Sequence, residues 1–315
     1  MFRPLRLIPA GTRIDFVGPR RLAFGLSGLL VLASIVLVAV LGLNFGIDFR
    51  GGILMEVRSE QAADIGQMRT TLGGLGLGEV SLQEFGAETD VLIRIQRQPG
   101  AEDEQIAAIA AVQEALGPGF DYRRTEFVGP TVGQELIEAG ILAVVLAMGG
   151  ILLYIWFRFE IQFGLCAVIA LTHDVVTTIG LFALIQHEFN LATVAALLTI
   201  AGYSINDTVV VFDRVRENLR RYKKAPLVEI LNRSLNETLS RTTITGLTTL
   251  LALVALYAFG GAVIRDFSLA LIWGVVIGTY SSIYVAVPLL LYVKLRPAAA
   301  GEGDTGGKAA ADPAE

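Results

Sequence analysis

Six long apolar runs constrain the fold of this chain more than any other feature. Runs of about 18 or more apolar residues are typical of helices that cross a bilayer. The runs cover residues 22–43, 136–156, 163–185, 189–212, 244–259 and 267–292. The fifth run is the shortest, and we expect its helix to begin before Arg241. With 53% hydrophobic and 17% charged residues, the sequence predicts an α-helical membrane protein with six transmembrane helices rather than a soluble domain.

Lysine and arginine residues predict how these helices are oriented. They gather in residues 1–21, in a link near residues 213–240, and just after the sixth run. Cytoplasmic loops carry such an excess, so all three regions, and both termini, are predicted to be cytoplasmic. We interpret the basic residues as contacts with anionic membrane lipid rather than with nucleic acid. The first run is longer than the core of a signal peptide, so we interpret it as an uncleaved anchor.

Several segments of the chain lie outside the predicted spans. The link near residues 213–240 has an apolar stripe on one face, which predicts a helix along the membrane surface or against a partner. Residues 296–315 are rich in alanine, glycine and acidic side chains, as in a disordered cytoplasmic tail. The transmembrane part is expected to cover residues 132–295, after a first helix at residues 22–43.

The acidic segment at residues 44–131 is predicted to be an extracytoplasmic, periplasmic domain. Alternating apolar residues predict strands at residues 53–58, 79–84, 90–96 and 120–127, with helices at residues 61–72 and 102–116. The order β-α-β-β-α-β favours a ferredoxin-like α+β fold. The segment contains no recognisable catalytic triad, metal cluster or phosphate loop, so we expect no enzyme activity, no cofactor and no metal. The single cysteine, Cys166, lies in a span and is interpreted as a packing residue.

Asp207 is an acidic residue within the fourth apolar run. An ionised carboxylate at membrane depth costs several kcal/mol unless it is paired or hydrated, which makes it a candidate functional residue. Thr199, Tyr203 and Asn206 precede it at the spacing that puts side chains on one face of a helix. The sequence therefore predicts a polar stripe along the fourth helix, with a titratable group in it.

A matching polar stripe opens the fifth span. Arg241 is followed by Thr245, Thr248 and Thr249 at helical spacing. Two such helices packed together would place Asp207 beside a fixed positive charge, which suits a proton pathway. The alternatives are a static salt bridge and an Arg241 side chain that reaches the inner surface.

Asp174 is a second acid, near the centre of the third span. Thr177 and Thr178 share its face, and His173 precedes it. A role in proton transfer and a purely structural bond to a neighbouring helix are both open for Asp174. His173 is weaker evidence, because adjacent residues point about 100° apart on a helix. The proton-pathway residues are predicted to be Asp207, Arg241, Asp174, Asn206 and Thr245.

Small residues follow one face of the sixth span. Gly274 and Gly278 are four residues apart, and Ser281 and Ser282 come next on the same face. Small residues at this spacing let helices approach closely. We therefore predict a helix-packing face that contains Gly274 and Gly278.

Several motifs together resemble the SecD/SecF family of protein-export membrane proteins, on its smaller, SecF-type side. The segments that carry the resemblance are residues 44–49 (NFGIDF) with Gly51 and Gly52, 127–133 (FVGPTVG), 202–214 (GYSINDTVVVFDR), 241–243 (RTT) with Thr248 and Thr249, and 278–282 (GTYSS). The resemblance covers about residues 20–295 in order. Arg50 departs from the small residue that would be expected between the two motifs of the first segment.

The resemblance implies both a fold and a set of partners. It implies a six-helix half of the RND superfamily in a bacterial inner membrane, paired with SecD. It also implies association with the SecYEG channel, and use of protons flowing inward to promote late export of an unfolded polypeptide. Asp207 and Arg241 fall on the family's proton-pathway positions.

Three other functions are compatible with buried acids in spans. An RND-type exporter of small molecules would share the polar seam, but residues 44–131 are few for a drug-gathering domain and no second such loop follows. A passive scaffold for SecD and the channel would have the same helices without proton transfer. An intramembrane protease fits poorly, because no aspartyl pair of that type and no Ser–His pair is apparent.

Overall fold

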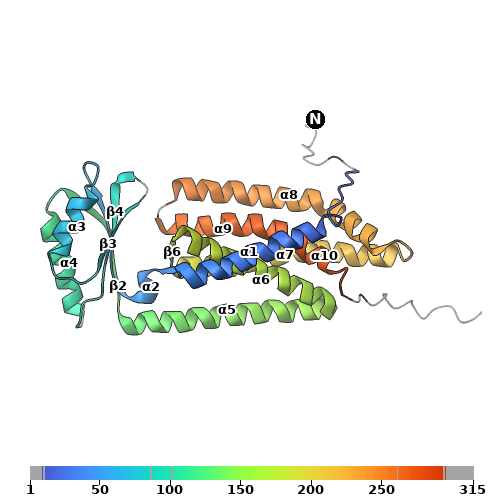
Figure 1. Ribbon diagram of the computed structural model, residues 1–315, viewed down its shortest axis with the longest axis horizontal. Coiled ribbons are helices and arrows are strands. Elements are labelled where there is room, and N and C mark those ends of the chain that lie inside the picture. Colours follow the sequence, from blue (N-terminus) through green and yellow to red (C-terminus); the bar gives the residue numbers. More distant parts are fainter. Residues whose placement is uncertain are drawn as a thin grey trace, which may run out of the picture.

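The computed structural model describes residues 9, 11–85, 87–100, 102–260, 262–293 and 295, so the predicted tail at residues 296–315 lies outside the described residues. Within that part, six helices are long and apolar enough to cross a membrane, which confirms the predicted number. They are α1 (Arg20–Leu41), α5 (Pro130–Arg158), α6 (Ile161–Ile185), α7 (Leu191–Arg221), α8 (Leu227–Phe259) and α9 (Ala262–Ser281), the last continued by the π-helical turn η1 (Ser282–Ala286) and α10 (Val287–Leu289). The long helices form one elongated bundle, and a small α+β unit lies at one end of it (Figure 1).

The fourth span begins two residues later than predicted. Phe189 lies in the short strand β6 (Glu188–Phe189), and α7 starts at Leu191. Asn190 follows the strand and caps α7. Its side-chain oxygen accepts a hydrogen bond from the backbone N–H of Thr193, at 3.0 Å, and its own backbone N–H donates to the Thr193 hydroxyl. This capping box satisfies amides that the first helical turn leaves unpaired.

The basic link does not form a separate surface helix, so that expectation is wrong. Instead α7 extends to Arg221 and α8 starts at Leu227, well before Arg241. The apolar stripe of the link is buried within the bundle, where Leu231 and Leu235 pack in the same core as Val211 of α7. Burial against a neighbouring helix removes this apolar surface from water, which favours it over an exposed position at the membrane surface.

The α+β unit contains the predicted order of strands and helices. It consists of β2 (Gly52–Ser59), α3 (Ile65–Gly73), β3 (Val80–Phe85), β4 (Ala87–Ile95), α4 (Glu102–Leu116) and β5 (Phe120–Val128). The antiparallel sheet has the strand order β3-β4-β2-β5. Helices α3 and α4 lie on the side of the sheet away from the bundle (Figure 1). Helix α3 starts later than predicted because Asp64 caps it, accepting a hydrogen bond from the Gln67 amide.

The α+β unit is joined to the bundle through contacts that the sequence did not predict. Strand β1 (Asn44–Phe45) pairs in parallel with β6, and the short helix α2 (Ile47–Arg50) leads into the sheet. Arg94 of β4 forms an ion pair with Glu188 of β6. At the entry to β2, Gly52 has a φ of +122°, and a Cβ there would lie 2.7 Å from the carbonyl oxygen of Ile95. Only glycine fits this approach without strain.

Candidate functional site

Asp174 of α6 is fully buried and surrounded by hydrogen-bond donors. The hydroxyl of Ser204 on α7 donates to its Oδ2 atom at 2.5 Å, and the hydroxyl of Ser281 on α9 donates to the same atom at 2.7 Å. His173 Nδ1 lies 2.9 Å from the other oxygen, Oδ1. Three neighbouring groups therefore compensate for the loss of water around a carboxyl group at membrane depth.

Asp207 of α7 is half-buried and is held by two hydroxyl groups. Thr242 of α8 donates to Oδ1 at 2.8 Å, and Ser282 at the start of η1 donates to Oδ2 at 2.7 Å. Both acids therefore bond to neighbouring helices rather than to an arginine.

Two consecutive serines connect these acids to one helix. Adjacent residues on a helix point about 100° apart, so Ser281 reaches Asp174 on α6 while Ser282 reaches Asp207 on α7. The residues of the sixth span that bind Asp174 and Asp207 are therefore neighbours in the chain, separated by a single peptide unit. The π-helical turn η1 begins at Ser282, and single π turns within α-helices are frequent at functional sites.

Each of these serines has a second acceptor within reach. Ser281 Oγ lies 3.1 Å from the carbonyl oxygen of Gly278, and Ser282 Oγ lies 3.0 Å from that of Thr279. A hydroxyl group has one proton to donate and lone pairs to accept. Each serine can therefore donate a hydrogen bond to an ionised carboxylate, or accept a hydrogen bond from a neutral carboxyl group while it donates to its own helix.

Close packing of α7 against α9 brings the serines within reach of the acids. A Cβ on Gly274 would lie 2.2 Å from Ile200 Cγ1, and one on Gly278 would lie 3.1 Å from Ser204 Cβ. Helices that approach this closely require glycine at the contact. The two glycines that we predicted as packing residues lie at this α7–α9 contact.

Arg241 does not contact Asp207 as the sequence led us to expect. Among the described residues no ion pair joins the two side chains, and Arg241 is exposed. Thr242, one residue further along α8, contacts Asp207 instead. The stripe on α8 is turned, so Arg241 and Thr245 face outward together with Asn206 on α7. The structure thus brings Asp207 and Asp174 into one hydroxyl-lined region and leaves the other three predicted residues on the surface.

The contacts that Ser281, Ser282, Ser204 and His173 make with the two acids were not predicted from the sequence. Ser281 and Ser282 were noted as part of a small-residue face, where packing alone explains them. Their position on the helix that touches both acid-bearing helices was the missing information. His173 Nδ1 contacts the carboxyl group of its own neighbour, which a 100° offset between adjacent residues does not exclude.

Six apolar helices, a small α+β unit after the first of them, and two carboxyl groups inside the spans define a multi-pass membrane protein with a buried titratable site. Comparisons with known proteins identify its family. Residues 108–296 match the C-terminal region of the protein export membrane proteins SecD/SecF, and residues 36–63 match the SecD/SecF GG motif. The chain is 51% identical over 298 residues to the protein translocase subunit SecF of Cereibacter sphaeroides, covering 92% of each chain. It is 47% identical over 291 residues to that of Rickettsia bellii, covering 91% of this chain and 95% of the relative.

A solved structure shows the same fold. The chain is similar to the crystal structure of SecDF, a translocon-associated membrane protein from Thermus thermophilus, with a TM-score of 0.81 and 37% identity. The similarity covers 91% of this chain but only 39% of the SecDF chain. The chain therefore belongs to the SecD/SecF family, whose members act in protein export by the Sec pathway. Its relatives are named as translocase subunits rather than as enzymes.

Proposed function

We propose that this chain is the SecF-type subunit of a proton-driven export unit, in which Asp207 gains and loses a proton. The observation that carries the proposal is the environment of Asp207. Its carboxyl group lies at membrane depth, has no cationic partner among the described residues, and is held by the hydroxyl groups of Thr242 and Ser282. A fixed arginine partner would favour the charged form throughout, whereas hydroxyl partners suit both forms.

Protonation would change the hydrogen bonds between three helices. When Asp207 is ionised, Ser282 donates to it and fixes α9 against α7. When Asp207 is neutral, Ser282 can turn its proton to the carbonyl oxygen of Thr279, and the bond between the helices weakens. A charge that crosses about 100 mV supplies roughly 2.3 kcal/mol. This energy can shift a two-state equilibrium by somewhat less than a hundredfold.

The exposed polar stripe supports a partner within the membrane. Thr199, Asn206, Arg241, Thr245 and Thr248 are all exposed on the spans of the isolated chain. A charged side chain such as Arg241 in a span costs about 2.5–3.5 kcal/mol or more when it faces lipid. SecD would cover this stripe and complete a seam in which Arg241 meets the proton pathway. The larger size of the solved SecDF chain is consistent with such a second half.

The remaining parts of the proposal follow from the family and from the charge pattern. The unit would sit in the bacterial inner membrane beside the SecYEG channel, with both termini in the cytoplasm. The α+β unit would then lie outside, where it can act on the unfolded polypeptide as it emerges. Its anchoring through Arg94 and Glu188 to the loop before α7 couples it to the helix that carries Asp207.

The test is Asp207→Asn in cells that lack the native copy, with export followed as a function of the proton-motive force. We expect proton-dependent export to be lost while the amount of protein in the membrane stays normal. Asp213→Asn is the matched control, because Asp213 lies on the same helix but pairs with Arg158 at its exposed end. Undiminished proton-dependent export by Asp207→Asn would leave the passive scaffold as the function.

A further inference from the structure

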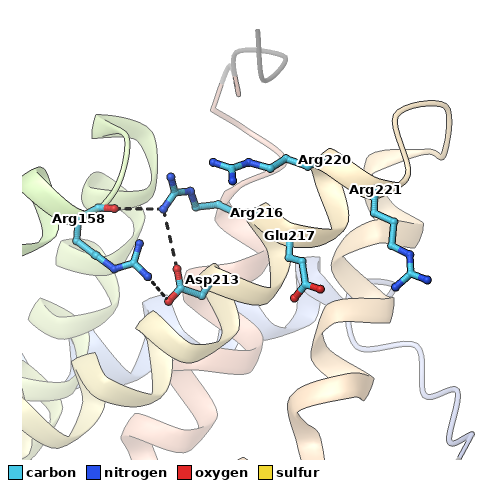
Figure 2. Close-up of a pocket in the computed structure, with 6 residues that line it drawn as sticks. All are labelled: Arg158, Asp213, Arg216, Glu217, Arg220 and Arg221. Carbon is cyan, nitrogen blue, oxygen red and sulfur yellow. Dashed lines mark hydrogen bonds and ion pairs between the residues drawn. The ribbon is translucent and has the colours of Figure 1, made fainter. Parts of the chain in front are cut away.

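An arginine-rich hollow of about 540 Å³ lies where α5 and α7 end, and neither Asp174 nor Asp207 lines it. Its lining residues are Arg158, Asp213, Arg216, Glu217, Arg220 and Arg221. Figure 2 shows Arg216 and Arg220 extending from α7 toward the end of α5, while Arg221 extends to the other side. The positive-inside rule places this end of the bundle at the cytoplasmic surface.

Both acids of the hollow are already paired. Arg158 Nη2 lies 2.6 Å from Asp213 Oδ2, and Arg216 Nη1 lies 3.9 Å from Asp213 Oδ1. Glu217 is bound by Arg214, with 2.6 Å between Nη1 and Oε2. The hollow therefore keeps an excess of positive charge that its own carboxylates do not neutralise.

Arg216 and Arg220 concentrate that excess on one side of α7. Arg220 has no acidic partner among the described residues, and like charges four residues apart on a helix repel each other. Arg216 is nevertheless held in place, since its guanidinium lies 5.3 Å from the centre of the Phe159 ring and donates to the Arg158 carbonyl oxygen at 3.2 Å. An anion between the two guanidinium groups would replace this repulsion with attraction.

The surface beside the hollow is apolar and aromatic. Trp156 and Phe157 at the end of α5 are 67% and 85% exposed, and Ile161 at the start of α6 is 69% exposed. Tryptophan side chains such as Trp156 are enriched at the depth of lipid headgroups. A ligand that occupies both the hollow and this apolar surface would need a negative group joined to hydrocarbon chains.

We propose that the hollow binds the phosphate group of an anionic phospholipid from the cytoplasmic leaflet, between Arg216 and Arg220. The acyl chains then lie along the exposed end of α5. The inference rests on the membrane placement given above but not on proton transfer at Asp207. Loss of lipid binding would therefore leave the export proposal standing, and the reverse also holds.

Trp156 provides a local reporter for the test. The chain has two tryptophans, so a Trp273→Phe background leaves Trp156 as the only tryptophan, which can be excited selectively at wavelengths that tyrosine does not absorb. The full chain is placed in vesicles of phosphatidylcholine with phosphatidylglycerol, and one lipid at a time is brominated to quench nearby tryptophan. One basic side chain near an anionic surface gives about a fivefold preference, so two give about thirtyfold. We expect phosphatidylglycerol to be enriched about thirtyfold over phosphatidylcholine beside Trp156.

Two pairs of charge-removing variants show whether the preference for phosphatidylglycerol arises in the hollow. Arg216→Gln with Arg220→Gln should abolish the preference, whereas Lys223→Gln with Lys224→Gln, which removes the same charge outside the hollow, should keep it. Arg220→Gln alone breaks no ion pair among the described residues and should lower the preference about fivefold. It therefore still tests the proposal if the double variant does not fold.

Three results would overturn the proposal. One is equal quenching of Trp156 by both brominated lipids. Another is an equal loss of preference in the arginine and lysine variants, which would indicate general surface attraction. The third is loss of the preference on addition of millimolar inorganic phosphate, which would assign the hollow to a soluble anion.

Discussion

Gly274→Ala should push α7 and α9 apart at the contact that lets the serines after Gly274 reach Asp174 and Asp207. The added Cβ would lie 2.2, 2.5 and 2.9 Å from the Cγ1, Cδ1 and Cγ2 atoms of Ile200. Ile200 is 1% exposed, and a β-branched side chain on a helix has one strongly preferred rotamer. The side chain therefore cannot turn away, and α7 and α9 must shift apart. Overpacking of this kind costs about 1–3 kcal/mol.

The separation should also affect the site. Ser281 and Ser282 continue the helix that carries Gly274, and their bonds to Asp174 and Asp207 are both 2.7 Å long. A shift of about 1 Å would take both contacts beyond hydrogen-bond length. We therefore expect Gly274→Ala to reduce proton-dependent export as well as stability.

A double-mutant cycle gives the decisive measurement. Unfolding in mixed micelles is compared for Gly274→Ala, Ile200→Ala and the two combined. Ile200→Ala alone should cost about 2–5 kcal/mol because it leaves a cavity, but the combined variant should be more stable than the sum by about 1–3 kcal/mol. Gly150→Ala on α5 is the control, because a Cβ there meets nothing within 4 Å. Additive effects at Gly274 and Ile200 would refute the close-contact explanation.

Two further predictions concern ionisable groups outside the spans. The Arg58 guanidinium holds the pKa of Asp90 below its ordinary 3.8, so this pair stabilises the fold above that pH and the effect is lost as pH falls through the lowered pKa. Thermal melting against pH should show that Asp90→Asn is less stable at neutral pH and loses this acid-dependent step; an unchanged acid limb would contradict it. The Asp266 carboxylate, 2.6 Å away, raises the pKa of His187 above 6.5, so its contribution is complete below pH 6.5 and is lost as pH rises through the raised pKa. His187→Gln should remove that alkaline loss in the same melting experiment, and a full-sized loss in the variant would show that another group causes it.

The long elements were predictable because each has a strong local signal. Glycine, proline and acidic residues bound α4, whose predicted limits at Glu102 and Leu116 are those observed. The six spans follow from hydropathy alone. The start of α7 was misplaced because Phe189 is apolar, and only the reciprocal bonds of Asn190 and Thr193 show that it ends a strand.

Contacts between distant segments were not predictable from periodicity. The pairing of β1 with β6 joins residues 44–45 to 188–189, and each strand has only two residues. So short a strand has no alternation to detect. In the site, helical spacing did not show that Thr199 and Asn206 of the α7 stripe face outward, nor how α8 is rotated relative to α7. That rotation decides that Thr242, rather than Arg241, reaches Asp207.

The position of Arg241 narrows the interpretations that the sequence left open. A static salt bridge with Asp207 is not formed within the described chain, where Thr242 and Ser282 bind the carboxyl group instead. Arg241 and Asn206 instead face outward from two neighbouring spans, where exposure to lipid is unfavourable. Asp207 already has its hydroxyl partners within this chain, whereas the exposed guanidinium of Arg241 still needs polar surroundings. A partner helix that covers Arg241 would therefore remove this unfavourable exposure, as the proposed assembly with SecD requires.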